Sequence, residues 1–278
     1  MQKDLSLNFY FIFKWVIIIS FVFYAVFPFL WLVLASLKTN AELLNNPFTL
    51  PEVFQFKNYS NAIQEAGLGR LIINSLVIST SATFLNILFS SMCAFAIARH
   101  TFWGNNVLFL MITAGILVPL NALIIPYFAI INFLNLYDTR IGLIIVYCAV
   151  GLPVSTFILT EFFKSIPKEI EEASYLDGCN FAARYFKIML PLALPGLATE
   201  GTFQFILCWN EFIYAMLLTS STDIRTIQFG ISYFTNQFFS DYVGMFAAVV
   251  ISIIPSITVF ILFQEKVING LTAGSVKG

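Results

Sequence analysis

Polar side chains stand at helical spacing inside a stretch of sequence that is otherwise apolar. Glu200, Gln204 and Glu211 lie at about 0, 40 and 20° around a helix that turns about 100° per residue. Charged groups at membrane depth are costly and usually face a water-filled cavity or a polar partner. The stripe therefore predicts either contacts along a solute path or hydrogen bonds to a neighbouring helix. Trp209 and Asn210, which stand beside this stripe in the sequence, are further candidates for the solute path.

The sequence lacks the groups that covalent or metal chemistry requires. It has no Gly-x-x-x-x-Gly-Lys-Ser/Thr phosphate-binding loop. Its 4 cysteines and 1 histidine form no spaced ligand set, and no nucleophile stands beside paired acids. We expect a chain that is not an enzyme and that binds no cofactor or metal. The net charge of -1 argues against a nucleic-acid partner.

The composition is that of an integral membrane protein. Hydrophobic residues make up 59% and charged residues 10% of the 278 residues, and the mean hydropathy is +0.86. A bilayer core of about 30 Å requires about 20 apolar residues per helix. We predict an all-α protein with six transmembrane helices in contact with membrane lipids. The apolar stretches are 11–36, 71–97, 106–131, 140–162, 187–218 and 244–264.

Basic residues indicate the orientation. A cytoplasmic N-terminus places most of the Lys and Arg residues on the cytoplasmic side, as the positive-inside rule requires. We therefore expect a multi-pass protein with both termini in the cytoplasm.

One long loop, between the fourth and fifth predicted spans, concentrates the charge. Pro167 suits the first turn of a helix, the glutamates after it complement the helix dipole, and Gly178 can end that helix in a left-handed conformation. The charged residues are Lys164, Lys168, Glu169, Glu171, Glu172, Asp177, Arg184 and Lys187. We predict a helix, a break and a second helix over Phe181–Lys187 at the membrane face, a shape that fits a socket in a cytoplasmic partner. The simpler interpretation of Glu172 is a solvated carboxylate at a helix start.

This loop resembles the signature of the permease subunits of bacterial ABC importers: Glu-Ala-Ala, three residues, Gly, nine residues, Ile, one residue, Leu-Pro. The matching residues are Glu172, Ala173, Ser174, Asp177, Gly178, Ile188, Leu190 and Pro191. The one departure is Ser174, which stands where the signature has its second alanine, and both residues are small. Further stretches resemble the maltose-type carbohydrate branch, and in particular its smaller permeases. They are Pro119, Ile125-Pro126-Tyr127, Thr139, Gly142-Leu143-Ile144, Trp209-Asn210-Glu211-Phe212 and the tail 270–278.

The resemblance implies the rest of a transport machine. A second, different permease would complete the path, two ATPase subunits carrying ATP and Mg would dock on the loop, and an extracytoplasmic binding protein would deliver sugar. The tail, through Thr272, Gly274 and Lys277, would reach between the ATPases. The chain would be one permease domain, 1–278, of the bacterial inner membrane. Its parts would be an N-terminal span at 11–36, a core at about 70–265 and a cytoplasmic tail at 265–278.

Two alternatives remain open on the sequence. An ion-coupled secondary carrier would bind its solute at a midplane site between inverted repeats, yet the two three-span halves show no similarity. An ABC permease for a solute other than sugar, such as an amino acid or phosphate, would leave the tail unexplained. The ionisable residues at membrane depth fit all three functions.

Overall fold

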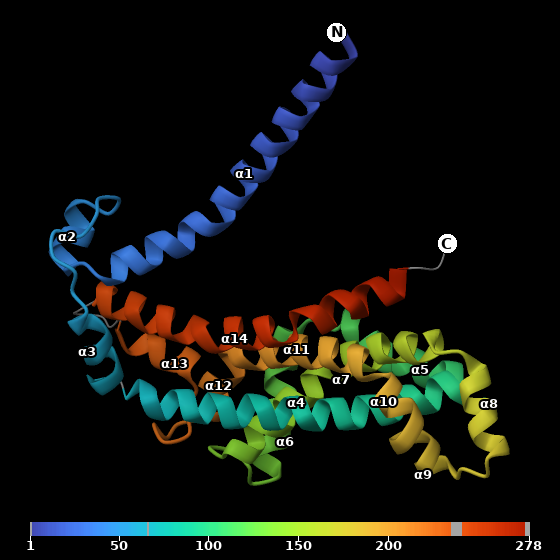
Figure 1. The fold of residues 1–278 in the computed structure, drawn as a ribbon. Coiled ribbons are helices and arrows are strands. Elements are labelled where there is room, and N and C mark those ends of the chain that lie inside the picture. The colour runs from blue at the N-terminus through green and yellow to red at the C-terminus, as the bar shows by residue number, and fades with distance from the viewer. Residues whose placement is uncertain (1, 66, 235–240, 276–278) are drawn as a thin grey trace. The chain divides into compact units, whose positions relative to one another are not determined.

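Every regular element in the described part of the chain is a helix (Figure 1). The computed structural model describes residues 2–65, 67–234 and 241–275. Contacts divide the chain into two units, one of Met1–Leu68 and Ile231–Ser252 and one of Gly69–Gly230 and Ile253–Gly278. The all-α prediction is confirmed for the described residues.

Four of the described helices are long and apolar enough to cross a membrane. They are α1 (Gln2–Ser36), α4 (Leu68–Arg99), α7 (Arg140–Ser165) and α14 (Tyr242–Ser275). Each contains one of the predicted apolar stretches. A pair of shorter helices raises the number to five if the pair counts as one span.

The third predicted span, 106–131, is this bent pair. Its elements are α5 (Asn105–Ala114), η1 (Gly115–Leu117), η2 (Leu120–Leu123) and α6 (Ile124–Phe133). The two halves meet at an angle of 100°. Pro119 explains the break, because proline disfavours helical backbone at the residue before it, and Val118 is extended with ψ 120°.

The fifth predicted span, 187–218, is also broken, so six continuous transmembrane helices are not confirmed. It consists of α10 (Leu190–Leu192), α11 (Leu194–Asn210) and α12 (Ile213–Leu218). Glu211 ends α11 with extended backbone, at ψ 129°. Its carboxylate accepts hydrogen bonds from the backbone N–H groups of Tyr214 at 2.8 Å and Ala215 at 3.1 Å. The side chain thus satisfies donors that the first turn of α12 leaves free.

In the first unit, α2 (Asn40–Asn45) and α3 (Lys57–Glu65) follow α1. The start of α14 belongs to the same unit. Its small core includes Trp31, Leu43 and Val243. Lys38 is 1% exposed, and its ammonium donates to the carbonyl of Asn46 at 2.7 Å. This buried lysine holds the turn that follows α2.

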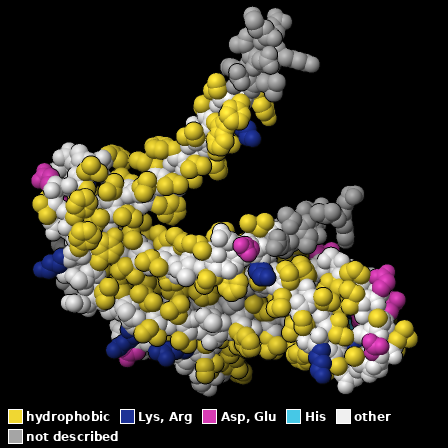
Figure 2. Space-filling model, in the orientation of Figure 1, with side chains coloured by type: hydrophobic (Ala, Val, Ile, Leu, Met, Phe, Trp, Pro, Cys, Tyr) yellow, Lys and Arg dark blue, Asp and Glu magenta, His cyan; other side chains and the backbone are white. Residues whose placement is uncertain are grey.

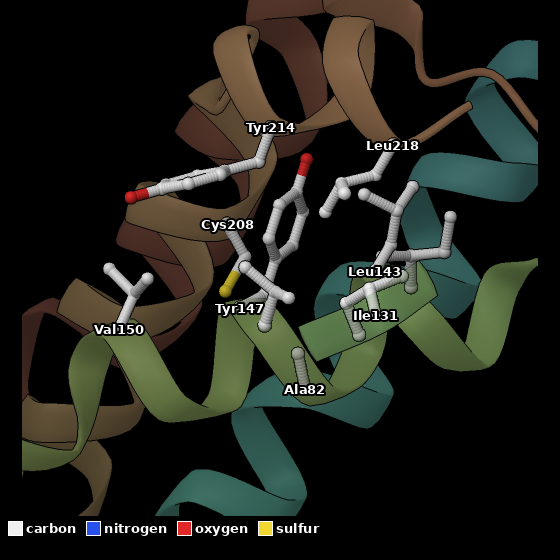
Figure 3. Packing of buried hydrophobic residues seen from close by; sticks show 10 residues of the cluster. Ala82, Ile131, Leu143, Tyr147, Val150, Cys208, Tyr214 and Leu218 are labelled. Atoms are coloured by element: carbon white, nitrogen blue, oxygen red, sulfur yellow. The ribbon is translucent and has the colours of Figure 1, made fainter. Parts of the chain in front are cut away.

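The second unit contains two apolar clusters. In the first, Tyr147 of α7, Cys208 of α11 and Tyr214 of α12 converge, as Figure 3 shows. The second cluster joins the C-terminal parts of α4 and α7 to the segment before α11, through Phe95, Phe163 and other residues. The short helix α13 (Ile227–Ile231) and the turn η4 (Ser232–Phe234) follow α12 in sequence.

Apolar side chains also cover much of the visible surface of the second unit (Figure 2). Acidic side chains gather at one end of this unit, around α8 (Lys168–Leu176). This distribution fits a protein whose helices lie in lipid and whose α8 lies in water.

Candidate functional site

The 167–191 loop contains the predicted helix, break and second helix. Helix α8 begins after Pro167 and ends at Leu176. Gly178 has φ +78°, its N–H donates to the carbonyl of Tyr175, and the N–H of Cys179 donates to that of Ser174, both at 3.1 Å. These two bonds are the Schellman ending of a helix, which requires a left-handed residue. The prediction that Gly178 ends the helix in this way is confirmed.

The second helical piece is longer than predicted. A single turn, α9 (Phe181–Ala183), is capped by the side chain of Asn180 and leads into a wider π-helical segment, η3 (Arg184–Met189). This segment runs directly into α10, where Pro191 supplies no backbone N–H. Ile188 and Leu190 are half-buried and Pro191 is exposed. The loop is therefore joined to α11 by nearly continuous helical backbone.

Glu171 fastens α8 to the end of α4. Its carboxylate lies 3.8 Å from the Arg99 guanidinium and 3.8 Å from that of Arg184. The exposed fractions of the side chains are 12% for Glu171 and 2% for Arg99. Arg99 also donates to the carbonyls of Phe163 and Ile166, both at 2.5 Å. One carboxylate thus holds two nearly buried cations, and Arg99 ties three helices together.

An aromatic cluster supports the same junction. The ring of Phe95 on α4 lies 5.3 Å from that of Tyr185, 5.5 Å from that of Phe181 and 5.8 Å from that of Phe163. The hydroxyls of Tyr185 and Ser91 share a hydrogen bond of 2.8 Å. Burial raises the pKa of Tyr185, and the bond to Ser91 lowers it in part. The hydroxyl is therefore protonated at neutral pH and can donate.

Apart from Ser174, the signature residues of α8 and of the break after it are exposed and have no such support. Ser174 points inward, is 4% exposed and donates to the carbonyl of Glu171 at 2.6 Å. Glu172, Ala173 and Leu176 are exposed, and Leu176 has 88% of its surface free. Asp177 and Gly178 at the break are exposed as well. Glu172, Ala173, Leu176 and Asp177 thus form a surface of α8 that no other part of the described chain covers.

A cleft of about 320 Å³ separates α8 from the end of α4. Arg99, His100 and Asn105 line one side, and Lys168, Glu171, Glu172 and Tyr175 line the other. The Arg184 guanidinium lies 5.1 Å from the ring centre of Tyr175. The cleft brings the signature residue Glu172 next to the anchored residues.

The second candidate set lies between α7 and α11. Glu200 is 2% exposed and accepts a hydrogen bond from the Ser155 hydroxyl at 2.6 Å. Gln204 is also 2% exposed and donates to the carbonyl of Tyr147 at 3.0 Å. Gly151 makes room for it, because a Cβ there would lie 2.0 Å from Gln204 Oε1. The two residues share one helix face, as predicted.

Glu211 directly follows the last residue of α11, so it lies at the end of this stripe, and its carboxylate turns toward the same α7 residue, Tyr147, that Gln204 contacts. The backbone leaves the helix after Asn210. The carboxylate accepts a hydrogen bond from the Tyr147 hydroxyl at 2.7 Å and caps α12. Trp209 is 1% exposed, whereas the exposed Asn210 accepts a hydrogen bond from Gln228 at 3.3 Å.

Comparison with known proteins assigns the chain to a family. The family described as the inner membrane component of binding-protein-dependent transport systems matches residues 86–272. The chain belongs to this family.

Two relatives illustrate the similarity of this permease to known ones. An ABC transporter permease protein of Caldicellulosiruptor sp. (strain Rt8B.4) is 39% identical, and the match covers 93% of this chain and 96% of the relative. The diacetylchitobiose uptake system permease protein of Streptomyces coelicolor is 34% identical, over 90% of this chain and 83% of the relative. The chain is thus an ABC importer permease, a transport subunit rather than an enzyme.

A solved structure agrees on the fold. It is that of a bacterial ABC transporter involved in the import of the acidic polysaccharide alginate. The TM-score is 0.81 at 24% identity, and the match covers 94% of this chain and 97% of that chain. The permease therefore has the fold of an ABC importer subunit over nearly its whole length. The family membership therefore excludes the alternative function of an ion-coupled secondary carrier.

Sequence reasoning missed the residues that hold the permease loop in place. Arg99 and Phe95 stand some 70 residues before Glu171, and no local pattern links them. The structure leaves the predicted tail contacts untested. Thr272 and Gly274 lie in α14, but their exposure is not described, and Lys277 lies outside the described residues.

Proposed function

We propose that this permease imports sugars or oligosaccharides and that two ATPase subunits drive it by docking on the 167–191 loop. A relative named for diacetylchitobiose uptake supports the sugar class. The observation that carries the coupling proposal is the division of α8 into two faces. Glu171 and Ser174 are held by the permease itself, whereas Glu172, Ala173 and Leu176 are free.

The free face has the chemistry of a docking surface. It combines an exposed leucine with a carboxylate, and the helix stands on a support of buried arginines and aromatic rings. A partner that pushes on α8 would move this support too, because α8 is fastened to α4 and α7 through Arg99. The residues that we assign to coupling are Glu172, Ala173, Ser174, Asp177, Gly178, Ile188, Leu190 and Pro191.

The proposed assembly contains more subunits. A second, different permease forms the other half of the path, an extracytoplasmic binding protein delivers the sugar, and ATP with Mg²⁺ binds to the ATPases. We place the permease in the bacterial inner membrane with both termini in the cytoplasm. The family description, which names both a binding protein and the inner membrane, supports this arrangement. Thr272, Gly274 and Lys277 of the tail are proposed to contact the ATPases.

We propose that the sugar path runs past α11. Glu200 and Gln204 are the candidates that α11 brings together, and Asn210 is the exposed one. Trp209 and Glu211 would support the path without touching the sugar, since Trp209 is buried and Glu211 caps α12. The path would then follow the face of α11 that also packs on α7.

A pair of substitutions at Gly178 tests the coupling. Gly178→Trp adds a bulky ring at the exposed break, whereas Gly178→Asn adds a small side chain that tolerates the left-handed backbone. The complex is purified in mild detergent with the subunits that accompany it, and ATP hydrolysis is measured with and without diacetylchitobiose and other neutral oligosaccharides. We expect sugar-stimulated hydrolysis with Asn and none with Trp. Normal stimulation in the Trp variant would refute docking at this break.

A further inference from the structure

A pocket of about 180 Å³ lies in the second unit, where α7 and α11 meet the break between η1 and η2. Most of its walls are apolar, and Glu200 and Gln204 supply polar groups from α11. Its lining includes Gly115, Val118, Pro153, Val154, Glu200 and Phe203. Ligand sites commonly have this character, with apolar walls and a few convergent polar groups.

One carboxylate oxygen of the lining residue Glu200 is buried without a partner. Oε1 of Glu200 accepts the bond from Ser155, whereas Oε2 has no hydrogen-bond partner in the described part of the chain. Buried polar atoms in proteins nearly always have a partner. The free oxygen therefore indicates that another molecule supplies a donor when the importer works.

The mouth of the pocket is better suited to water or protein than to lipid. Val154 and Phe203, two residues of the lining, are 42% and 45% exposed in this chain. Val118, another residue of the lining, is 39% exposed and has extended backbone. Irregular backbone at membrane depth occurs only where protein buries it or water reaches it. A carboxylate has the same requirement. These features suit a mouth that opens toward protein or water rather than toward lipid.

We propose that this pocket holds one sugar ring during transport, with Oε2 of Glu200 accepting a hydrogen bond from a ring hydroxyl. The apolar walls and the ring of Phe203 suit the C–H faces of a sugar. At about 180 Å³ the pocket is smaller than the roughly 300–1,000 Å³ of sites for drug-sized ligands, so it suits a single ring better than a chain of rings. This inference rests on the proposed sugar specificity.

A metal cation fits the pocket less well. Cations such as Ca²⁺ take six or more oxygen ligands, and no group of three or more His, Cys, Asp or Glu residues able to hold a metal occurs among the described residues. A single free oxygen binds a hydroxyl weakly, which suits a molecule that must leave again.

Thiol labelling at the mouth of the pocket tests the proposal without the natural sugar. Val154→Cys is introduced into the full-length chain within the complete complex. It is treated either with a methanethiosulfonate that carries a glucosyl group or with one that carries a benzyl group. Peptide mass spectrometry measures the rate at position 154, and Trp103→Cys, at a fully exposed position, is the reference for aqueous access.

We expect the glucosyl reagent to label position 154. Glu200→Leu should lower the rate of this labelling about tenfold, since a hydrogen bond to a charged group is lost. The benzyl reagent should be slowed less than twofold. Glu200→Gln keeps the side-chain volume and one acceptor oxygen, so it should lower the glucosyl labelling rate less than Glu200→Leu does. It replaces the Leu variant in the test if that variant does not assemble. Labelling by the benzyl reagent alone, or equal glucosyl rates with and without Glu200, would overturn the proposal. Stimulated ATP hydrolysis tests sugar specificity separately.

Discussion

Removing the Glu171 carboxylate should loosen the 167–191 loop from the body of the permease. Glu171→Ala takes away the charge that lies 3.8 Å from both Arg99 and Arg184. Both guanidinium groups then stay in surroundings where their side chains are 2% and 12% exposed. A charge left alone in a buried place is destabilising, because water cannot compensate for the lost partner.

The size of the effect follows from the geometry. At 3.8 Å and an effective dielectric constant of about 20, each attraction amounts to about 4 kcal/mol before desolvation is subtracted. Breaking a buried ion pair from one side typically costs about 3–5 kcal/mol. Arg99 keeps its two carbonyl acceptors and the carboxylate is 12% exposed, so we expect about 2–3 kcal/mol. That corresponds to about a 30- to 150-fold larger population of the opened loop.

Limited trypsin digestion measures this opening, since the loop contains Lys168 and Arg184. The matched control is the neighbouring residue, Glu172→Ala, which removes an exposed carboxylate from the free face of α8. We expect faster cleavage only in Glu171→Ala. Stimulated ATP hydrolysis should fall in both variants, through a loose loop in one and a lost contact in the other.

Equal cleavage rates in the two variants would refute this reasoning, because burial would then have no bearing on the stability of the loop. A double-mutant cycle refines the test. Arg99→Met alone should also loosen the loop, and the added cost of Glu171→Ala in that background should shrink. Full additivity would show that the two side chains do not interact.

Two further substitutions, each with a control, and one truncation test other parts of the structure. Gly151→Ala should lower the thermal stability of the detergent-purified complex by about 1–3 kcal/mol, since its Cβ would collide with Gln204. Gly69→Ala, with no described atom within 4 Å of its Cβ, is the control and should not be destabilising. Lys38→Met should cost about 2–3 kcal/mol and expose the turn after α2 to protease, whereas Lys57→Met at an exposed position should not. Removing residues 271–278 should leave membrane insertion intact but weaken the coupling of ATP hydrolysis to uptake, and unchanged uptake would count against a role for the tail.

Features that depend on local sequence were predictable. Apolar stretches of about 20 residues give α1, α4, α7 and α14, because a helix in lipid must be apolar along its length. The ending of α8 at Gly178 was predictable as well, since few residues other than glycine adopt the left-handed backbone. Pro167 and the glutamates that follow it correctly indicated the start of a helix in the loop.

The breaks inside the spans were not predictable from hydropathy. The stretches around Pro119 and Glu211 are apolar enough to count as continuous, yet both leave the helix. At Glu211 the reason is tertiary, because the carboxylate bonds to Tyr147 of α7 and caps the next helix. A helical wheel assumes unbroken geometry, so it could place Glu211 at the end of the stripe but could not show that the helix ends there.

The loop and the pocket are connected through α7. Ser155, which holds Glu200, and Phe163, whose carbonyl accepts from Arg99, lie on the same unbroken helix, separated by about 12 Å at about 1.5 Å per residue. The loop also continues with little interruption into α11, which carries Glu200 itself. A displacement of α8 would therefore act on two helices that both contribute residues to the pocket, α7 through Arg99 and α11 through the backbone. The proposed docking surface and the proposed solute pocket thus share the same two helices.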